Sequence, residues 1–233
     1  MRRLAHRGRV HDWPENTIAS LPSALALTDG VEVDVRLSAD GVPILMHDSE
    51  VDRTTDGTGA VDALTKSELS QLSVGGRAPI PTLHDYIAAA MRLGASLILL
   101  DVKDPTPAAL AATVEVVSGA SRVEVLLAVR SDEALSELRG LAPTAQLASL
   151  GVTVDDVHDR IANGKSLGVD VLFIHHGDRA YQHHRAAVAT IRAHGLLAGA
   201  STLCTVRAVD LAEADGCGYA LVDLPLTTSE ESS

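Results

Sequence analysis

The amino-acid sequence predicts a single α/β barrel of eight parallel strands with one extra antiparallel strand. Short, almost continuously apolar runs alternate with amphipathic stretches along the 233 residues, which is typical of repeated βα units around a parallel sheet. Strands that are buried on both faces give such runs, as in residues 96–100 and 171–174. The length fits one α/β barrel, and a 46% apolar content supplies one sizeable core.

Nine segments read as strands and seven as helices. The predicted strands are Arg3–Ala5, Val31–Leu37, Pro43–His47, Ser96–Lys103, Val123–Val129, Ala145–Leu150, Val169–His175, Leu196–Ser201 and Gly218–Asp223. The predicted helices are Thr17–Leu27, Leu83–Leu93, Pro107–Val117, Ser131–Leu138, Val154–Leu167, Asp178–His194 and Val206–Ala214. No linker divides the chain, so we expect one domain over residues 1–226 and a polar tail over 227–233.

One of the nine strands cannot belong to the parallel ring. Only five residues, with an Asp-Gly turn signal, separate Leu37 from Pro43, whereas a parallel crossover needs about a dozen. The segment Pro43–His47 therefore returns antiparallel along Val31–Leu37. This hairpin is expected to bring His47 opposite Asp34 or Glu32, at the same end of the barrel.

Two carboxylates project together from the strand Val31–Leu37. Glu32 and Asp34 are two residues apart, so they share one face of the strand. Burying two uncompensated carboxylates in a barrel is costly, and a divalent cation with oxygen ligands is an economical compensation. The alternative is a solvated edge strand with a chance Glu-x-Asp.

A second pair follows the apolar run at residues 96–100. Asp101 and Lys103 share a face at the carboxyl end of this strand, where the active sites of α/β barrels lie. Asp101 is a candidate third metal ligand, and Lys103 is a candidate charge for holding a phosphate. The alternative interpretation is an internal ion pair.

Two histidines end strands on the same side of the predicted barrel. His6 ends the first strand and is followed by Arg7, a natural partner for an anion, and His47 ends the returning strand. Two imidazoles beside a phosphodiester would supply a general base and a general acid near neutral pH. Either histidine alone could instead be a structural hydrogen-bonding group. His175 also ends a strand, and we expect it to line the same mouth.

The amino-acid composition limits the kinds of molecule that this chain is expected to bind. Lys plus Arg number 19 and Asp plus Glu 31, for a formal net charge of −12, which argues against binding to nucleic acid or to an anionic membrane surface. No apolar run approaches the roughly 18 residues that a membrane helix needs, so we expect no membrane insertion. The two cysteines cannot form a disulfide framework, and only Arg2 and Arg3 separate Met1 from the first motif. The expected location is the cytoplasm.

Eight short motifs occur in a fixed order along the chain. They are AHRG (5–8), PENT (14–17), E-x-D (32–34), DG-x-P-x-x-x-HD (40–48), RTT-x-G-x-G (53–59), PTL (81–83), D-x-K (101–103) and D-x-P (223–225). Each motif is weak alone, but the set in this order is specific. The chain therefore resembles the glycerophosphodiester phosphodiesterase family over residues 5–225.

The resemblance implies a TIM-type (β/α)8 barrel with a small insertion, at about residues 48–80, that covers the mouth. It also implies roles for seven residues: acid/base catalysis by His6 and His47; binding of one Mg²⁺ or Ca²⁺ by Glu32, Asp34 and Asp101; phosphate binding by Arg7 and Lys103. The implied reaction is hydrolysis of a small-molecule glycerophosphodiester to an alcohol and sn-glycerol 3-phosphate. A monomer or homodimer is expected.

The sequence departs from the family pattern in three places. The third acidic ligand is usually Glu, and Asp101 is one methylene shorter, so weaker metal binding is expected. An aromatic–Thr–Val–Asn string is replaced by residues 201–204, and a Ser–Phe pair by Val129 and Arg130. Aromatic faces commonly hold choline through cation–π attraction. With Trp13 the only obvious aromatic near the mouth, a smaller or polar headgroup contacted by Arg130 is expected.

Two other functions remain open at this point. One is a phosphodiester lyase of the sphingomyelinase-D or bacterial phosphatidylinositol phospholipase C kind, which also resembles a barrel with two histidines. The other is a non-catalytic barrel that binds phosphate esters. With two basic groups against three acidic ones, the mouth is expected to be negative until a cation binds, so the cation should precede the substrate.

Overall fold

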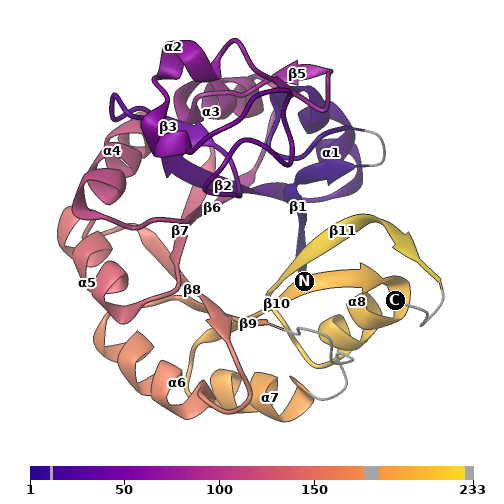
Figure 1. The fold of residues 1–233 in the computed structure, drawn as a ribbon. Helices are drawn as coiled ribbons and strands as arrows, with labels where there is room; N and C mark the ends of the chain where they lie inside the picture. The colour runs from indigo at the N-terminus through magenta and orange to yellow at the C-terminus, as the bar shows by residue number, and fades with distance from the viewer. Residues whose placement is uncertain (11–12, 176–183, 229–233) are drawn as a thin grey trace.

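A computed structural model describes residues 1–10, 13–175 and 184–228. A closed ring of eight parallel strands is surrounded by helices (Figure 1). The ring strands are β1 (Arg2–Val10), β2 (Gly30–Leu37), β6 (Leu97–Val102), β7 (Glu124–Val129), β8 (Gln146–Val152), β9 (Val171–His175), β10 (Leu197–Thr205) and β11 (Tyr219–Thr227). The helices are α1 (Leu21–Leu27), α2 (Lys66–Leu69), α3 (Leu83–Arg92), α4 (Pro107–Ser118), α5 (Asp132–Leu141), α6 (Val157–Ser166), α7 (Arg185–Ala193) and α8 (Val206–Ala214).

Closure of the ring comes from parallel pairing of β1 with both β2 and β11. The predicted α/β barrel is therefore confirmed. Strand β11 continues to Thr227, one residue into the stretch expected to be a tail. The first part of the predicted helix Asp178–His194 lies outside the described residues.

The extra strand β3 (Pro43–Leu45) lies outside the ring and pairs antiparallel with β2. Leu37 is opposite Pro43 and Val35 is opposite Leu45, so the predicted hairpin is confirmed. The strand ends two residues before the predicted end at His47. The amide N–H of Met46 still donates to the carbonyl oxygen of Asp34 at 3.1 Å, which keeps the following residue beside the end of β2.

Apolar side chains form two layers on either side of the ring strands. The outer layer packs the strands against the helices. The inner layer fills the barrel, and it includes Leu97 and Leu99 of β6, Leu126 and Ala128 of β7, and Phe173 of β9. Because side chains alternate along a strand, the residues that continue these inward rows toward the carboxyl ends point into the mouth.

The insertion after β3 has a small apolar cluster of its own. It contains the 3₁₀ helix η2 (Val61–Ala63), α2, and the hairpin β4 (Ser73–Val74) and β5 (Ala78–Pro79). Its cluster consists of Ile44, Met46, Val51, Val61, Leu69, Val74 and Ile80. Figure 1 shows the insertion beside β2 and β3 at one side of the ring, not over its centre. The expectation that it covers the mouth is therefore wrong.

The helices of the described ranges are short. None of them has the length and apolar character to cross a membrane.

Candidate active site

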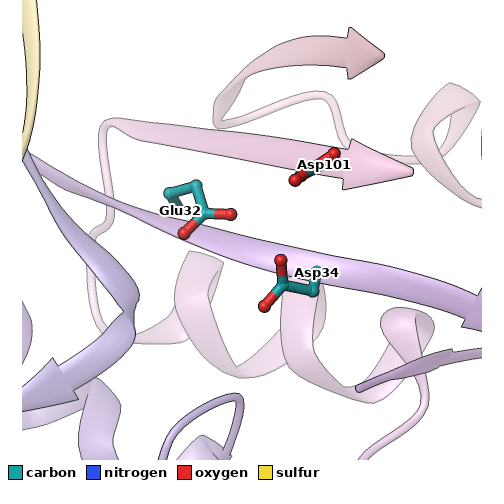
Figure 2. A group of neighbouring side chains, drawn as sticks. All are labelled: Glu32, Asp34 and Asp101. Carbon is teal, nitrogen blue, oxygen red and sulfur yellow. The ribbon is translucent and has the colours of Figure 1, made fainter. Parts of the chain in front are cut away.

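Three carboxyl groups meet at the carboxyl ends of β2 and β6. Glu32 and Asp34 lie on β2, and Asp34 pairs in register with Asp101 of β6. All three residues are at most 2% exposed, and one oxygen from each lies within 4.8 Å of the others. Figure 2 shows the three side chains gathered on the same side of the two strands. The sequence prediction that these carboxylates converge is thus met by the geometry.

Two basic side chains contact this cluster directly. The Lys103 Nζ lies 2.9 Å from an oxygen of Asp34 and 2.6 Å from Oδ2 of Asp101. The Nη1 of Arg130 donates to the other oxygen of Asp101, Oδ1, at 2.8 Å. The ion pair between Asp101 and Lys103 is therefore present, together with the three-carboxylate cluster.

The carboxyl groups of the cluster differ in proton affinity. Burial, and then the neighbouring charges of Asp34 and Asp101, raise the pKa of Glu32 to about 7. Burial also acts to raise the pKa of Asp34, but Lys103 and the amide of Asn16 outweigh it and hold this pKa below its ordinary value. A buried carboxyl group with two carboxylates beside it therefore holds its proton more tightly than a free one. Three clustered carboxylate oxygens suit a hard divalent cation, so the residues present fit the ion expected from the sequence.

Asn16 orients Asp34 through two hydrogen bonds. Its Nδ2 donates to Oδ2 of Asp34 at 2.8 Å, and its Oδ1 accepts from the Asp34 amide N–H at 3.0 Å. Asn16 is 3% exposed and has φ of 56°, a left-handed conformation that Asn tolerates better than most residues. Asn16 belongs to the PENT motif, but nothing in the sequence pattern indicates this role.

Arg7 is held by the carboxylates around it. Its amide N–H donates to Oε2 of Glu32 at 2.7 Å, and its Nη1 donates to Glu15 at 3.1 Å. Its Nε lies 3.6 Å from Asp34. Arg7 has φ of 54°, and at this point the backbone turns its N–H toward the cluster. Glu15 also contacts Arg53 of the insertion at 2.7 Å, so it connects the cavity to the insertion.

Each of the two candidate catalytic histidines contacts a carboxylate through Nδ1. His6 Nδ1 lies 2.8 Å from Asp223, and His47 Nδ1 lies 2.5 Å from Asp48. In both cases this contact leaves Nε2 as the nitrogen available to a ligand. Both aspartates belong to the ordered motifs, at 40–48 and 223–225, but the motifs alone predict no role for them. The pair of His6 and Asp223 is not visible in the sequence, because the two residues lie more than 200 positions apart.

The two imidazoles have opposite pKa shifts. Burial acts to lower the pKa of His6, but the hydrogen bond to Asp223 and the charge of Glu32 outweigh it, so the pKa is raised. Burial lowers the pKa of His47, and the hydrogen bond to Asp48 offsets only part of this effect. Arg53 also pairs with Asp48, which leaves less of the carboxylate's charge for the imidazole.

A cavity of about 260 Å³ brings most of the predicted residues together. Its lining consists of His6, Arg7, Glu32, His47, Asp101, Lys103, Arg130, Leu150, Gly151, His175, Ser201, Thr202 and Leu221. Asp34 is buried and is not itself part of the lining. Among the described residues, the insertion at 48–80 contributes nothing to it.

Trp13 does not belong to this lining, and the expectation that it does is wrong. It lies at a separate hollow of about 400 Å³, together with Arg9, Arg53 and Arg77. Among the described residues of the first connection, Pro14 and Glu15 share this hollow with Trp13.

Arg130 also changes the charge balance expected at the mouth. The cavity and the carboxylate beneath it hold three basic side chains, Arg7, Lys103 and Arg130, against three acidic ones. With Arg130 counted, these basic and acidic side chains are equal in number. The expectation that the mouth is negative until a cation binds rested on Arg7 and Lys103 alone and stays a prediction.

The ring and its cavity define an α/β barrel whose functional groups gather at the carboxyl ends of the strands, as in enzymes of this architecture. The model of the glycerophosphoryl diester phosphodiesterase family matches residues 6–217. The chain belongs to that family, as the motifs predicted.

Relatives and solved structures agree with this assignment. The chain is 42% identical over 110 residues to glycerophosphodiester phosphodiesterase 1 of Bos taurus, which covers 43% of this chain and 33% of the bovine protein. The chain thus spans about a third of the length of that relative and of its human counterpart.

The structural similarity extends over nearly the whole chain. A phosphodiesterase of Oleispira antarctica, solved in complex with the product sn-glycerol-3-phosphate, superposes with a TM-score of 0.86 at 27% identity, covering 97% of this chain and 94% of the other. A glycerophosphodiester phosphodiesterase of Agrobacterium tumefaciens has a TM-score of 0.78 at 26% identity, with 96% of each chain covered.

Proposed function

We propose that this chain hydrolyses glycerophosphodiesters to an alcohol and sn-glycerol 3-phosphate. The observation that carries the proposal is the single cavity in which a buried carboxylate cluster meets two imidazole–carboxylate pairs. Family membership and the product bound in the Oleispira antarctica enzyme support the same reaction class.

In this proposal Glu32, Asp34 and Asp101 hold one divalent cation, Mg²⁺ or Ca²⁺. When bound, the cation offsets the negative charge on the phosphoryl oxygens. Arg7 and Lys103, which line the same cavity, orient the phosphate. Each of these two basic groups is itself held by carboxylates, so it is fixed in place before the substrate arrives.

His47 and His6 move the protons. We assign His47 as the general base. Arg53 pairs with Asp48, so Asp48 stabilises the protonated imidazole less, and the pKa of His47 is lowered. We assign His6 as the general acid, because Asp223 stabilises its protonated form and its pKa is raised.

The glycerol 2-hydroxyl is the nucleophile in the first step. Its oxygen attacks phosphorus while His47 accepts its proton, and the bond from phosphorus to the alcohol oxygen breaks as His6 donates a proton to it. The alcohol leaves, and a cyclic glycerol phosphate remains. Water then opens the cyclic ester with the two histidines in reversed roles, which gives sn-glycerol 3-phosphate and restores both protonation states.

The test is release of sn-glycerol 3-phosphate from glycerophosphoglycerol, with Mg²⁺, Ca²⁺ or EDTA. His6→Ala and His47→Ala are each expected to lower kcat by about 10²–10⁴-fold. His84→Ala is the matched control, because this exposed histidine lies on α3 outside the cavity.

Three outcomes would contradict the proposal. A cyclic phosphate as the final product would identify a lyase. Ligand binding without turnover would identify a binding protein. Normal turnover of a substrate that lacks the 2-hydroxyl would exclude the proposed nucleophile.

A further inference from the structure

We propose that Arg130 determines substrate specificity by binding a second anionic group, a carboxylate or phosphate carried by the substrate beyond the scissile phosphodiester. This inference rests on the proposed hydrolysis and adds the class of substrate: diesters with an anionic alcohol portion are preferred over those with a cationic one.

Strand alternation directs Arg130 into the cavity. Leu126 and Ala128 of β7 belong to the inner apolar layer; Arg130, the residue directly after the strand, continues this row and lines the cavity. Ala128 pairs in register with Asp101, so Arg130 lies one step above the carboxylate cluster, toward solvent.

The backbone of Arg130 is held in place, and its guanidinium is tied to Asp101. The Nη2 of Arg160 donates to the carbonyl oxygens of Arg130 at 2.8 Å and Leu150 at 3.0 Å, and to Oγ of Ser149 at 2.6 Å. Gly151 lies beside the stem, and a Cβ built there would be 3.9 Å from Cγ of Arg130. Such anchoring places the guanidinium at little entropic cost on binding.

The guanidinium retains donors after its contact with Asp101. A guanidinium carries five N–H donors in a planar fork, and one nitrogen, Nη1, contacts Asp101 at 2.8 Å. The Arg130 side chain is 53% exposed, whereas that of Asp101 is 3% exposed. One end is therefore anchored on a buried carboxylate, and the rest of the fork faces the mouth, where it fits a carboxylate or phosphate.

In the described part of the chain, the wall beside Arg130 carries no group of opposite charge to a cation. Beside Arg130, the wall from β8 to β10 consists of Leu150, Gly151, His175, Ser201 and Thr202, without a carboxylate. Within the described ranges, no Phe, Tyr or Trp lines the cavity either, so a trimethylammonium group beside Arg130 would face a guanidinium, and none of these described side chains would hold it by a cation–π contact.

Three substrates that differ in charge at the far end test the inference. They are glycerophosphoglycerol with a terminal phosphate, glycerophosphoglycerol itself, and glycerophosphocholine. For the native chain, kcat/KM is expected to fall in that order. Arg130→Gln is expected to lower kcat/KM about 10–100-fold for the anionic substrate and only about 3-fold or less for the neutral one, since a hydrogen bond between two charged groups is stronger than one to a neutral group.

Two further variants control the experiment. Arg122→Gln removes the same charge at an exposed position before β7, at the opposite end of the barrel, and should leave all three values unchanged. Arg130→Lys keeps the charge but loses the fork, and should retain part of the preference.

The ratio between substrates separates the two hypotheses. If Arg130→Gln lowers all three values equally, Arg130 acts only through Asp101 and the specificity inference is wrong, while the hydrolase proposal stands. If the native chain hydrolyses none of the three, the hydrolase proposal fails and this inference fails with it.

Discussion

Replacing Asn16 by Ala is expected to destabilise the protein by about 3–5 kcal/mol. The amide loses a hydrogen bond to the Asp34 carboxylate at 2.8 Å, worth about 1.5–3 kcal/mol, and one from the Asp34 amide at 3.0 Å, worth about 1 kcal/mol. Ala in the left-handed conformation, at φ of 56°, adds about 1 kcal/mol. The loss is a large fraction of the roughly 5–15 kcal/mol that stabilises a typical domain.

Urea unfolding followed by circular dichroism measures this change. EDTA is present throughout, because a bound cation would add its own stabilisation. Asn163→Ala is the matched control. Asn163 also donates from Nδ2 to a carboxylate, that of Asp132 at 2.6 Å, but the contact is on the surface. Its replacement should change the free energy of unfolding by no more than about 0.5 kcal/mol.

A comparison of the two variants decides the question. Equal losses in Asn16→Ala and Asn163→Ala would refute the reasoning that Asn16 fixes a buried carboxylate. A loss confined to Asn16→Ala would support it.

Three further predictions address the fold, the pH response and the cation. Gly30→Ala should lower the free energy of unfolding by about 2 kcal/mol or more, because a Cβ there would lie 2.3 Å from a carbonyl oxygen of β6. Gly140→Ala is the control: this position is open and lies within a helix, so the substitution should not lower the free energy of unfolding. Equal urea midpoints for the two variants would contradict this prediction. Because the pKa of His6 is raised in the folded protein, its pairing with Asp223 stabilises the fold fully below the ordinary pKa of histidine, and this stabilisation is lost as the pH rises through the raised pKa. In urea titrations, Asp223→Asn should therefore lower the free energy of unfolding more at about pH 5.5 than at about pH 9. Equal losses at the two pH values would argue against the ion pair. Mg²⁺ at about 100 times its Kd should raise Tm by about 5–10 °C, and Glu32→Gln should abolish most of that shift; an unchanged shift would remove Glu32 from the cation site.

Much of the fold followed from local pattern and connection length. The apolar runs and their spacing predicted the ring strands, and the five-residue connection before Pro43 predicted the antiparallel β3. The same periodicity of two placed Glu32 beside Asp34 and Asp101 beside Lys103. These relations lie within a strand or between strands joined by a short turn, so they are visible in a short stretch of sequence.

The contacts that organise the site were harder to predict. Asp223 meets His6 only because β11 closes the ring against β1. Asn16 reaches Asp34 from a connecting segment whose backbone conformation no periodicity reveals. Trp13 was expected at the mouth, but it lines another hollow together with Arg53 and Arg77.

The sequence by itself determined the class of fold, the strand ends that bear the acidic, basic and imidazole groups, and the family. Only the tertiary structure decided which carboxylate serves each histidine, that Arg130 joins the acidic cluster, and that the insertion stands to one side of the mouth. The physical reason is that side-chain alternation is a local property of the chain. Ring closure and register between distant strands are set by packing of the whole barrel.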